Sequence, residues 1–347
     1  MTLNQFGRKL FTVAGVVGVA AMMFVAACGT SSTGSNSSSV NTSLTACHVT
    51  AADLTLSTSS TTPAAPTAVT GLSGQQLTID GSSALQPFFV AAAKYFDQGQ
   101  GTHTTAVANG SGNGLKDVES GAVQIGMSDF FYQQDPAVPN PSTVFADLVD
   151  HQVAVVPFSL VVSKDISSQI ENLTTQEIVD IYTGKVTNWS QIGGPNELVT
   201  VINRPLVSGT RATFRKYVLN GATESAGTTL TQDTTGAVAA ALSTTNGAIG
   251  YVANGFVLNP QYSSSIFPIC INGFGATSQN INSGSYLYWS FEHAYTKGTP
   301  AANSAAQQFL NYVVTAPVQN SLLPQLGYLQ VSNLTQAALA THPAPTN

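Results

Sequence analysis

From Gln76 onward, short apolar runs alternate with amphipathic stretches, which is the pattern expected of α/β units. Residues 76–96 predict a strand, a turn and a helix in succession. Residues 103–129 repeat this order, with a first strand, a Gly/Ser turn, a helix over 115–120 and a second strand over 123–127. The chain is therefore expected to form an α/β fold with mixed sheets.

The next apolar stretch, residues 153–165, is rich in β-branched residues and contains Pro157. A proline removes a backbone donor, so we expect it to interrupt the strand and to mark the point where the chain crosses between domains. The helix predicted over 174–185 begins with a capping box formed by Thr174 and Glu177. Further strands are predicted over 198–205, 247–252 and 285–295, and further helices over 209–221 and 304–316.

The N-terminus has the order of an export signal: Arg8 and Lys9, then an apolar run from Leu10, then small residues that end at Cys28. Because the last four of these residues resemble the lipobox of bacterial lipoproteins, residues 1–27 are predicted to be a lipoprotein signal peptide and Cys28 the lipidated first residue. The alternative is a transmembrane anchor, since the run is nearly long enough to span a bilayer.

Residues 28–73 are dominated by Ser, Thr and Ala, which predicts a flexible tether between the lipid and the folded part. Outside the cytoplasmic membrane the redox environment permits disulfides. We therefore expect Cys47 and Cys270 to form a bridge, the alternative being two isolated thiols.

The composition limits the possible partners. With 347 residues and 43% hydrophobic content the chain can bury a core and hold two domains. The formal net charge is −6, which argues against a nucleic-acid partner bound through a general basic surface. Any anionic ligand must therefore be bound by a local arrangement of donors.

Three turns share one physical feature: a strand ends in Gly and Ser or Thr, and a helix begins directly afterwards. A helix N-terminus presents unpaired N–H groups and about half an elementary positive charge, which suits an anion. Ordinary capping by Ser or Thr is the alternative at each turn taken alone. Three of them, with Arg204 just before the third, favour a shared anion pocket; they are DGSSALQP (80–87), NGSGNGLK (109–116) and VSGTRATF (207–214).

Asp129 follows the strand predicted over 123–127, and a carboxylate is unexpected beside a bound anion. It is explained if the anion carries a proton, because an ionised carboxylate accepts a hydrogen bond from phosphate and repels sulfate. The alternative is that Asp129 caps the following segment.

These motifs together resemble the high-affinity phosphate-binding proteins of bacterial phosphate ABC transporters, over about residues 76–330. The motifs that carry the resemblance are GSSALQP, GSGNGLKDVESGAVQIGMSD, LTTQEIVDIYTGKVTNW, RPLVSGTRATF, GAIGYV and AAQQFLNYVVTAPVQNSLLPQLGY.

The resemblance implies a two-lobed, type II-like periplasmic-binding-protein (Venus-flytrap) fold with the ligand cleft between the lobes. Lobe I would consist of residues 74–157 and 283–347, and lobe II of residues 158–282. It further implies a monomeric, lipid-anchored receptor on the outer face of the cytoplasmic membrane, which binds inorganic phosphate and delivers it to a membrane permease.

The residues that match the family's motif define the expected phosphate site. Hydroxyl and backbone groups of the three turns would donate to phosphate, Asp129 would accept its proton, and an arginine would pair with its charge. The site residues are Ser83, the backbone N–H of Ala84, Ser111, Asp129, Arg204, Ser208, Gly209 and Thr210.

Two departures from the family's pattern affect this site. Ser83-Ala84 stands where members commonly have Thr-Phe, so one apolar wall is open or is filled from elsewhere. Pro205 follows Arg204 where members tend to carry an acidic residue that orients the arginine, so either the affinity is altered or Arg211 takes part in binding.

Other functions find less support in the residues. The five histidines and three cysteines form no HExxH or CxxC motif, so neither a metal site nor a cofactor is expected, and the glycines match no nucleotide-binding pattern. No GxSxG motif surrounds Ser208, so a phosphatase-like hydrolase is the least favoured alternative and no enzyme activity is expected. The stronger alternative is a protein of the same fold that binds sulfate or molybdate, or that serves in surface signalling or adhesion.

Trp189 and residues 286–289 are expected to pack in the core rather than to stack on a ligand.

Overall fold

The computed structural model describes Cys47, Asp53 and residues 62–225, 227–230 and 234–345. The predicted signal peptide over 1–27, the lipidation site Cys28 and most of the predicted tether lie outside these residues. Within the described ranges, no helix combines the length and the apolar character that crossing a membrane requires.

The described strands form a ten-stranded mixed sheet with the order β2-β1-β3-β10-β4-β8-β6-β7, and β9 pairs with β4 and β5 off this path. The parallel pairs β1–β2 and β1–β3 bring the carboxyl ends of these strands to one edge. The strands are β1 (Gln76–Gly81), β2 (His103–Ala108), β3 (Ile125–Ser128), β4 (Leu148–Ser163), β5 (Asn172–Leu173), β6 (Thr200–Asn203), β7 (Thr228–Thr229), β8 (Ala248–Ala253), β9 (Ile266–Ile271) and β10 (Trp289–Lys297).

Strand β4 joins the two halves of the sheet. It pairs antiparallel with β10 from Leu148 to Pro157, and with β8 from Phe158 onward. The prediction that Pro157 interrupts the strand is therefore wrong: the strand continues, and its partner changes at that residue. The backbone around Pro157 stays paired because the Phe158 N–H donates to the Tyr288 carbonyl at 3.0 Å. The lobe boundaries at 157/158 and 282/283 stay a prediction.

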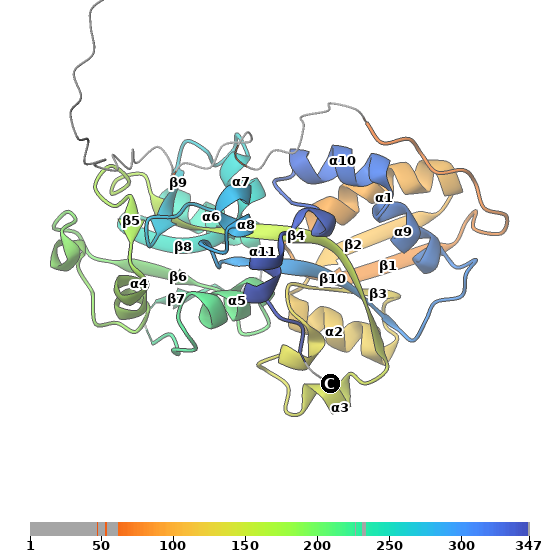
Figure 1. Ribbon diagram of the computed structural model, residues 1–347, viewed down its shortest axis with the longest axis horizontal. Helices are drawn as coiled ribbons and strands as arrows, with labels where there is room; N and C mark the ends of the chain where they lie inside the picture. The colour runs from red at the N-terminus through yellow and green to blue at the C-terminus, as the bar shows by residue number, and fades with distance from the viewer. Residues whose placement is uncertain (1–46, 48–52, 54–61, 226, 231–233, 346–347) are drawn as a thin grey trace, which may run out of the picture. The chain divides into compact units, whose positions relative to one another are not determined.

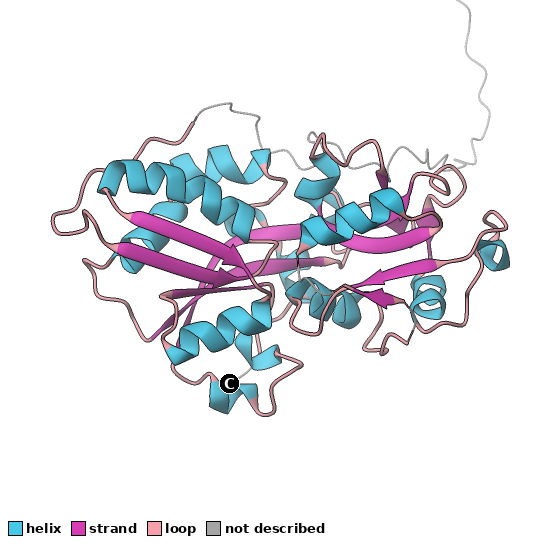
Figure 2. Cartoon of the chain, turned by 180° about the vertical axis from the view of Figure 1, so that it is seen from behind, coloured by secondary structure: helices cyan, strands magenta, loops and turns pink. Residues whose placement is uncertain are grey.

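Helices cover both faces of each half of the sheet (Figures 1 and 2). In one half, α1, α9 and α10 lie on one face and α2 on the other. In the other half, α6 and α7 lie opposite α5 (Figure 1). The helices are α1 (Gln86–Gln100), α2 (Ser111–Ser120), α3 (Pro141–Val144), α4 (Thr175–Tyr182), α5 (Gly209–Tyr217), α6 (Thr235–Thr244), α7 (Asn254–Leu258), α8 (Ser278–Asn282), α9 (Ala305–Val313), α10 (Ala316–Gln325) and α11 (Gln336–Thr341).

Aromatic side chains fill both halves of the core. Phe309 of α9 packs edge-on against Phe89 of α1 at 5.1 Å, and in the other half Phe214 of α5 stacks on Tyr251 of β8 at 4.4 Å between ring centroids. The expectation of core packing is confirmed for Trp189, Tyr286, Tyr288 and Trp289, which are all at most 2% exposed, whereas Leu287 is 39% exposed.

A disulfide joins Cys47 to Cys270 of β9, with 4.9 Å between their Cα atoms. It closes a loop of 223 residues, so it attaches the segment before the fold to the half of the sheet that contains β9.

Several elements begin or end differently from the sequence prediction, and one difference matters for the site. Helix α2 begins at Ser111 instead of residue 115, because Gly110 turns the chain with φ 93° directly before it. A non-glycine residue rarely adopts this conformation. Ser111 therefore lies in the first turn of a helix. The capping box of Thr174 and Glu177 is confirmed at α4.

Candidate anion-binding site

Buried polar residues meet where strand ends and helix starts from both halves of the sheet come together. Ser82 and Ser83 follow β1, Ser111 begins α2 and Asp129 follows β3. From the other half, Arg204 follows β6, Ser208 is the N-cap of α5, Thr210 lies in its first turn, and Thr235 begins α6. All of these residues are at most 4% exposed: Ser82, Ser83, Ser111, Asp129, Arg204, Ser208, Thr210 and Thr235.

Asp129 accepts hydrogen bonds from three hydroxyl groups. Thr210 donates to its Oδ2 at 2.9 Å, Ser111 donates to its Oδ1 at 3.2 Å, and Ser82 donates to the same oxygen. Its backbone N–H donates in turn to Ser111 Oγ at 3.1 Å. Hydroxyl donors satisfy carboxylate oxygens without cancelling the negative charge, so the site retains an anionic acceptor.

Arg204 extends its guanidinium toward the turn that follows β1. Its Nη2 donates to Ser83 Oγ at 2.8 Å and its Nη1 lies 3.5 Å from Thr235 Oγ1. The Ser83 and Thr235 hydroxyl oxygens are 3.3 Å apart. The three groups form a compact set of donors, of which Thr235 was not among the predicted site residues.

The start of α5 lies so close to α2 that only a glycine fits there. A Cβ atom on Gly209 would lie 2.2 Å from Ser111 Oγ and 2.8 Å from Asp129 Cβ. Ser208, directly before it, caps the helix by accepting the Arg211 N–H at 3.3 Å. The predicted residues Ser208, Gly209 and Thr210 thus place the α5 N-terminus directly against Asp129.

Hydrogen bonds cross from one half of the sheet to the other at this point. Besides the contacts of Thr210 with Asp129 and of Arg204 with Ser83, the Gly112 N–H donates to the Val207 carbonyl at 3.1 Å. The donors of α2 and α5 therefore face a common centre, and the two halves are closed over it.

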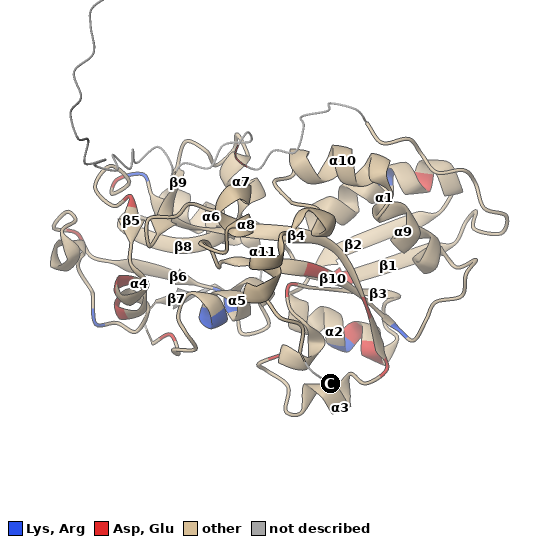
Figure 3. Cartoon of the chain, viewed as in Figure 1, with Lys and Arg blue, Asp and Glu red and all other residues tan. Residues whose placement is uncertain are grey.

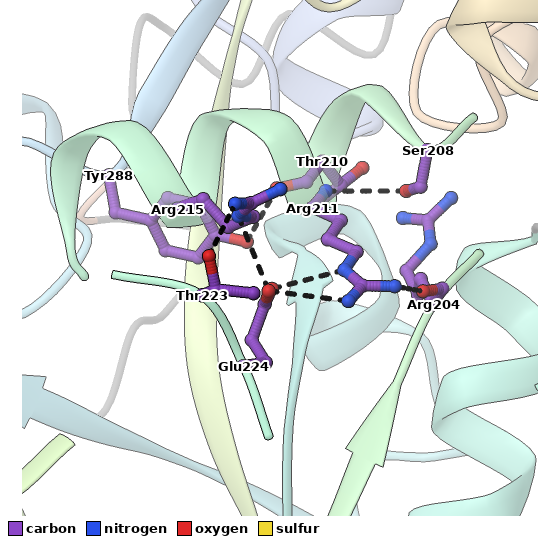
Figure 4. A network of polar contacts seen from close by, with 8 residues as sticks. All are labelled: Arg204, Ser208, Thr210, Arg211, Arg215, Thr223, Glu224 and Tyr288. Atoms are coloured by element: carbon purple, nitrogen blue, oxygen red, sulfur yellow. Dashed lines mark hydrogen bonds and ion pairs between the residues drawn. The ribbon is translucent and has the colours of Figure 1, made fainter. Parts of the chain in front are cut away.

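Arg211 has a different role from the one considered for it. Its guanidinium binds both carboxylate oxygens of Glu224, at 3.0 and 3.2 Å, and Nη1 donates to the Arg204 carbonyl (Figure 4). Arg215 adds a second ion pair to Glu224 at 3.3 Å. Arg211 and Arg215 thus both pair with Glu224, and Arg211 supports the backbone of Arg204.

Ala84 lies at the predicted position but its backbone is already engaged. Its N–H donates to Ser82 Oγ at 3.0 Å, and its carbonyl accepts from the Tyr328 hydroxyl. Tyr328, which follows helix α10, is buried and lies against this turn.

Sequence reasoning also missed Ser82 and Thr235. Ser82 directly precedes the predicted site residue Ser83 in the same turn, and the sequence does not give the direction of either side chain. Thr235 begins α6, directly after the N-cap residue Thr234. The combination of hydroxyl residues with a helix start, which indicated the other three turns, could therefore have indicated Thr235 as well.

No group of three or more His, Cys, Asp or Glu side chains lies close enough to hold a metal ion within the ranges that the structure describes.

Comparison with known proteins places this geometry in a family. The family model described as the PBP superfamily domain matches residues 57–317. The phosphate-binding protein PstS of Bacillus subtilis (strain 168) is 38% identical over 259 residues, which are 74% of this chain and 81% of that protein.

Solved structures share the fold. A structure from Clostridium perfringens, described as a phosphate ABC transporter substrate-binding protein with bound phosphate, has a TM-score of 0.64 and 23% identity, over 74% of this chain and 100% of that one. An ABC-type phosphate transport receptor from Vibrio cholerae has a TM-score of 0.57 and 20% identity, over 73% of this chain and 99% of that one. The chain therefore belongs to the PBP superfamily and, within it, to the family of the phosphate-binding protein PstS.

Proposed function

We propose that this protein binds inorganic phosphate between its two lobes and delivers it to the permease of an ABC transporter. The observation that carries the proposal is one buried cluster that holds an arginine, an aspartate and six hydroxyl groups at helix starts and in the turn after β1. The identity to the PstS of Bacillus subtilis, 38% over 259 residues, supports the choice of phosphate.

In this site the donors of the protein replace the water around the ligand. Arg204 supplies the positive charge, and the hydroxyls and N–H groups at the α2 and α5 N-termini supply hydrogen bonds. Asp129 accepts a hydrogen bond from the protonated oxygen of the ligand and penalises an oxyanion such as sulfate, which has no proton to donate. The hydrogen bonds across the two halves would form as the lobes close.

The same residues favour a binding protein over a hydrolase. The Ser208 hydroxyl accepts the Arg211 N–H and serves as a helix cap. The histidines His151, His293 and His342 contact Thr296, Asp150 and Trp289, respectively. A serine nucleophile requires a general base within hydrogen-bond reach, and these contacts occupy the histidines elsewhere.

The proposed function also requires a place at the membrane and a permease that accepts the phosphate. We infer that Cys28 carries a lipid that anchors the protein to the outer face of the cytoplasmic membrane, and that residues 28–73 act as its tether. The receptor would act as a monomer that meets a membrane permease, as its family membership suggests. If phosphate failed to bind, the favoured function would be that of a sulfate or molybdate receptor, or of a surface signalling or adhesion protein.

Replacement of the arginine tests the proposal. In equilibrium dialysis with labelled phosphate, the ligand-stripped wild type is expected to bind one phosphate per chain. Arg204→Ala is expected to weaken binding by about a hundredfold or more, since loss of a buried charged partner costs about 2–5 kcal/mol. Normal binding by the variant would remove Arg204 from the site, and absence of binding by the wild type would overturn the function.

A further inference from the structure

Strand β10 carries a second carboxyl group close to Asp129. Glu292 is fully buried, and its Oε2 lies 3.5 Å from Ser82 Oγ. The same Ser82 hydroxyl donates to Asp129 Oδ1. One serine therefore stands between two carboxyl groups, and sequence reasoning assigned no role to the second.

A β-bulge accompanies this placement of Glu292. In the pairing of β10 with β4, Glu292 lies opposite Ala154 but the next residue, His293, lies opposite Gln152, so the register shifts between them. Bulges commonly re-aim a side chain beside a functional site. His293 is directed to another partner, since its Nδ1 lies 2.8 Å from Asp150.

The surroundings of Glu292 do not support a negative charge. It takes part in none of the ion pairs formed by the described residues, and its Oε1 has no hydrogen-bond partner among them. The titratable groups that interact with it are Asp129 and Tyr328, and neither is a cation. Burial, and then the charge of Asp129, raise the pKa of Glu292 well above its usual range, and the smaller opposing effects of the Ser82 and Ser290 hydroxyls do not cancel this rise.

The hydrogen bonds decide which of the two carboxyl groups is ionised. Asp129 accepts from three hydroxyls, which stabilise its charged form. The N–H groups of Ala84 and Leu85 each donate to Ser82 Oγ at 3.0 Å, so the lone pairs of this oxygen are used and its own proton is directed to Asp129. When two interacting carboxyl groups hold one proton between them, the proton lies on the group whose surroundings stabilise a charge less well, which here is Glu292, and the charge lies on Asp129.

We propose that Glu292 is a specificity-determining residue that holds the proton of this carboxyl pair, so that Asp129 remains the ionised acceptor for a protonated oxyanion. The proposal rests on the proposed function, because the oxyanion is taken to be phosphate. Glu292 acts through Ser82 and Asp129 and is a positioning residue. If it lost its proton, the site would contain two carboxylates next to the ligand, and binding would weaken as the pH rises through the pKa of Glu292.

The test is the pH profile of phosphate binding in the wild type and in Glu292→Gln, which has the same shape but cannot ionise. Phosphate itself titrates in this range, so the two proteins are compared at each pH between 6 and 10. The ratio of the wild-type Kd to the variant Kd is expected to rise with pH, approaching about tenfold per pH unit once Glu292 ionises. A ratio that stays constant across the pH interval in which the Glu292 carboxyl group is seen by NMR to ionise would overturn the proposal.

Asp135→Asn is the matched control, because it also removes a buried carboxyl group whose pKa is raised by burial, 4% exposed. Its Kd ratio to the wild type should not change with pH. If Asp135→Asn gave the same rising ratio as Glu292→Gln, the effect would come from net charge, and the role of Glu292 would be wrong.

A measurement on the wild type keeps the proposal testable if Glu292→Gln does not fold. The sequence contains six glutamates, and carboxyl-carbon NMR of glutamate-labelled protein follows each of them. One resonance is expected to remain protonated at pH 7 without phosphate, while the others are ionised. Six ionised glutamates at pH 7 would overturn the proposal, whereas failure of the wild type to bind phosphate would overturn only the proposed function.

Discussion

Two carboxylates lie beside helix α5, and different kinds of donors satisfy them. At the start of the helix, Asp129 accepts hydrogen bonds from the hydroxyls of Thr210, Ser111 and Ser82. Glu224, in contrast, binds the guanidinium groups of Arg211 and Arg215 (Figure 4). Hydroxyls leave the charge of a carboxylate in place, whereas guanidinium groups neutralise it.

The two clusters therefore have different roles: the Glu224 cluster stabilises the fold, and the Asp129 cluster is proposed to recognise the ligand. The Glu224 cluster contains a side chain that is 0% exposed, and its charge is balanced inside the protein, so it stabilises the fold and holds the Arg204 carbonyl through Arg211. In the proposed function, the Asp129 carboxylate, which accepts hydrogen bonds from hydroxyls, discriminates between ligands by whether they donate a proton. Of the basic residues of α5 (Figure 3), Arg211 and Arg215 thus belong to the Glu224 cluster.

Breaking the ion-pair cluster is expected to have the largest effect on stability. Glu224→Ala leaves two guanidinium groups without their carboxylate, so the free energy of unfolding in urea should fall by about 3–5 kcal/mol. The control is Asp180→Ala in the exposed pair with Lys185, where the loss should be below about 1 kcal/mol. If Glu224→Ala abolished phosphate binding but kept its stability, the division between the two clusters would be wrong.

A smaller effect is expected at the hydroxyl cluster, and it should appear in binding. Thr210→Val removes a hydroxyl that donates to Asp129 at 2.9 Å, which should weaken phosphate binding about tenfold to a hundredfold, since hydrogen bonds to charged groups contribute about 1.5–3 kcal/mol. Thr213→Val makes the same change one turn further along α5, where the side chain is also buried. Calorimetry should show little change for Thr213→Val, and equal losses for both variants would contradict a specific role for Thr210.

The sequence predicted the fold and much of the cluster because each turn is a local feature. Strand, Gly/Ser turn and helix N-terminus follow one another in the chain, so Ser83, Ser111 and Thr210 could be placed at strand-to-helix turns without knowledge of distant contacts. The family resemblance supplied the assembly of these turns around one ligand.

The parts that could not be predicted depend on distant contacts. The partner of Arg211 is Glu224, which lies beyond the end of α5, and no local pattern indicates that pair. Glu292 appeared as one residue in a strand, and only the pairing of β10 brings it to Ser82. Pro157 was misjudged because the strand remains intact when its partner changes.

The central claim is that Asp129 selects an anion that carries a proton. The most direct measurement is calorimetric titration of ligand-stripped wild type and Asp129→Asn with phosphate and with sulfate. The wild type is expected to bind phosphate one-to-one and not to bind sulfate, and Asp129→Asn is expected to gain measurable sulfate affinity because an amide can donate a hydrogen bond. Unchanged selectivity in Asp129→Asn would show that Asp129 does not select the protonated anion.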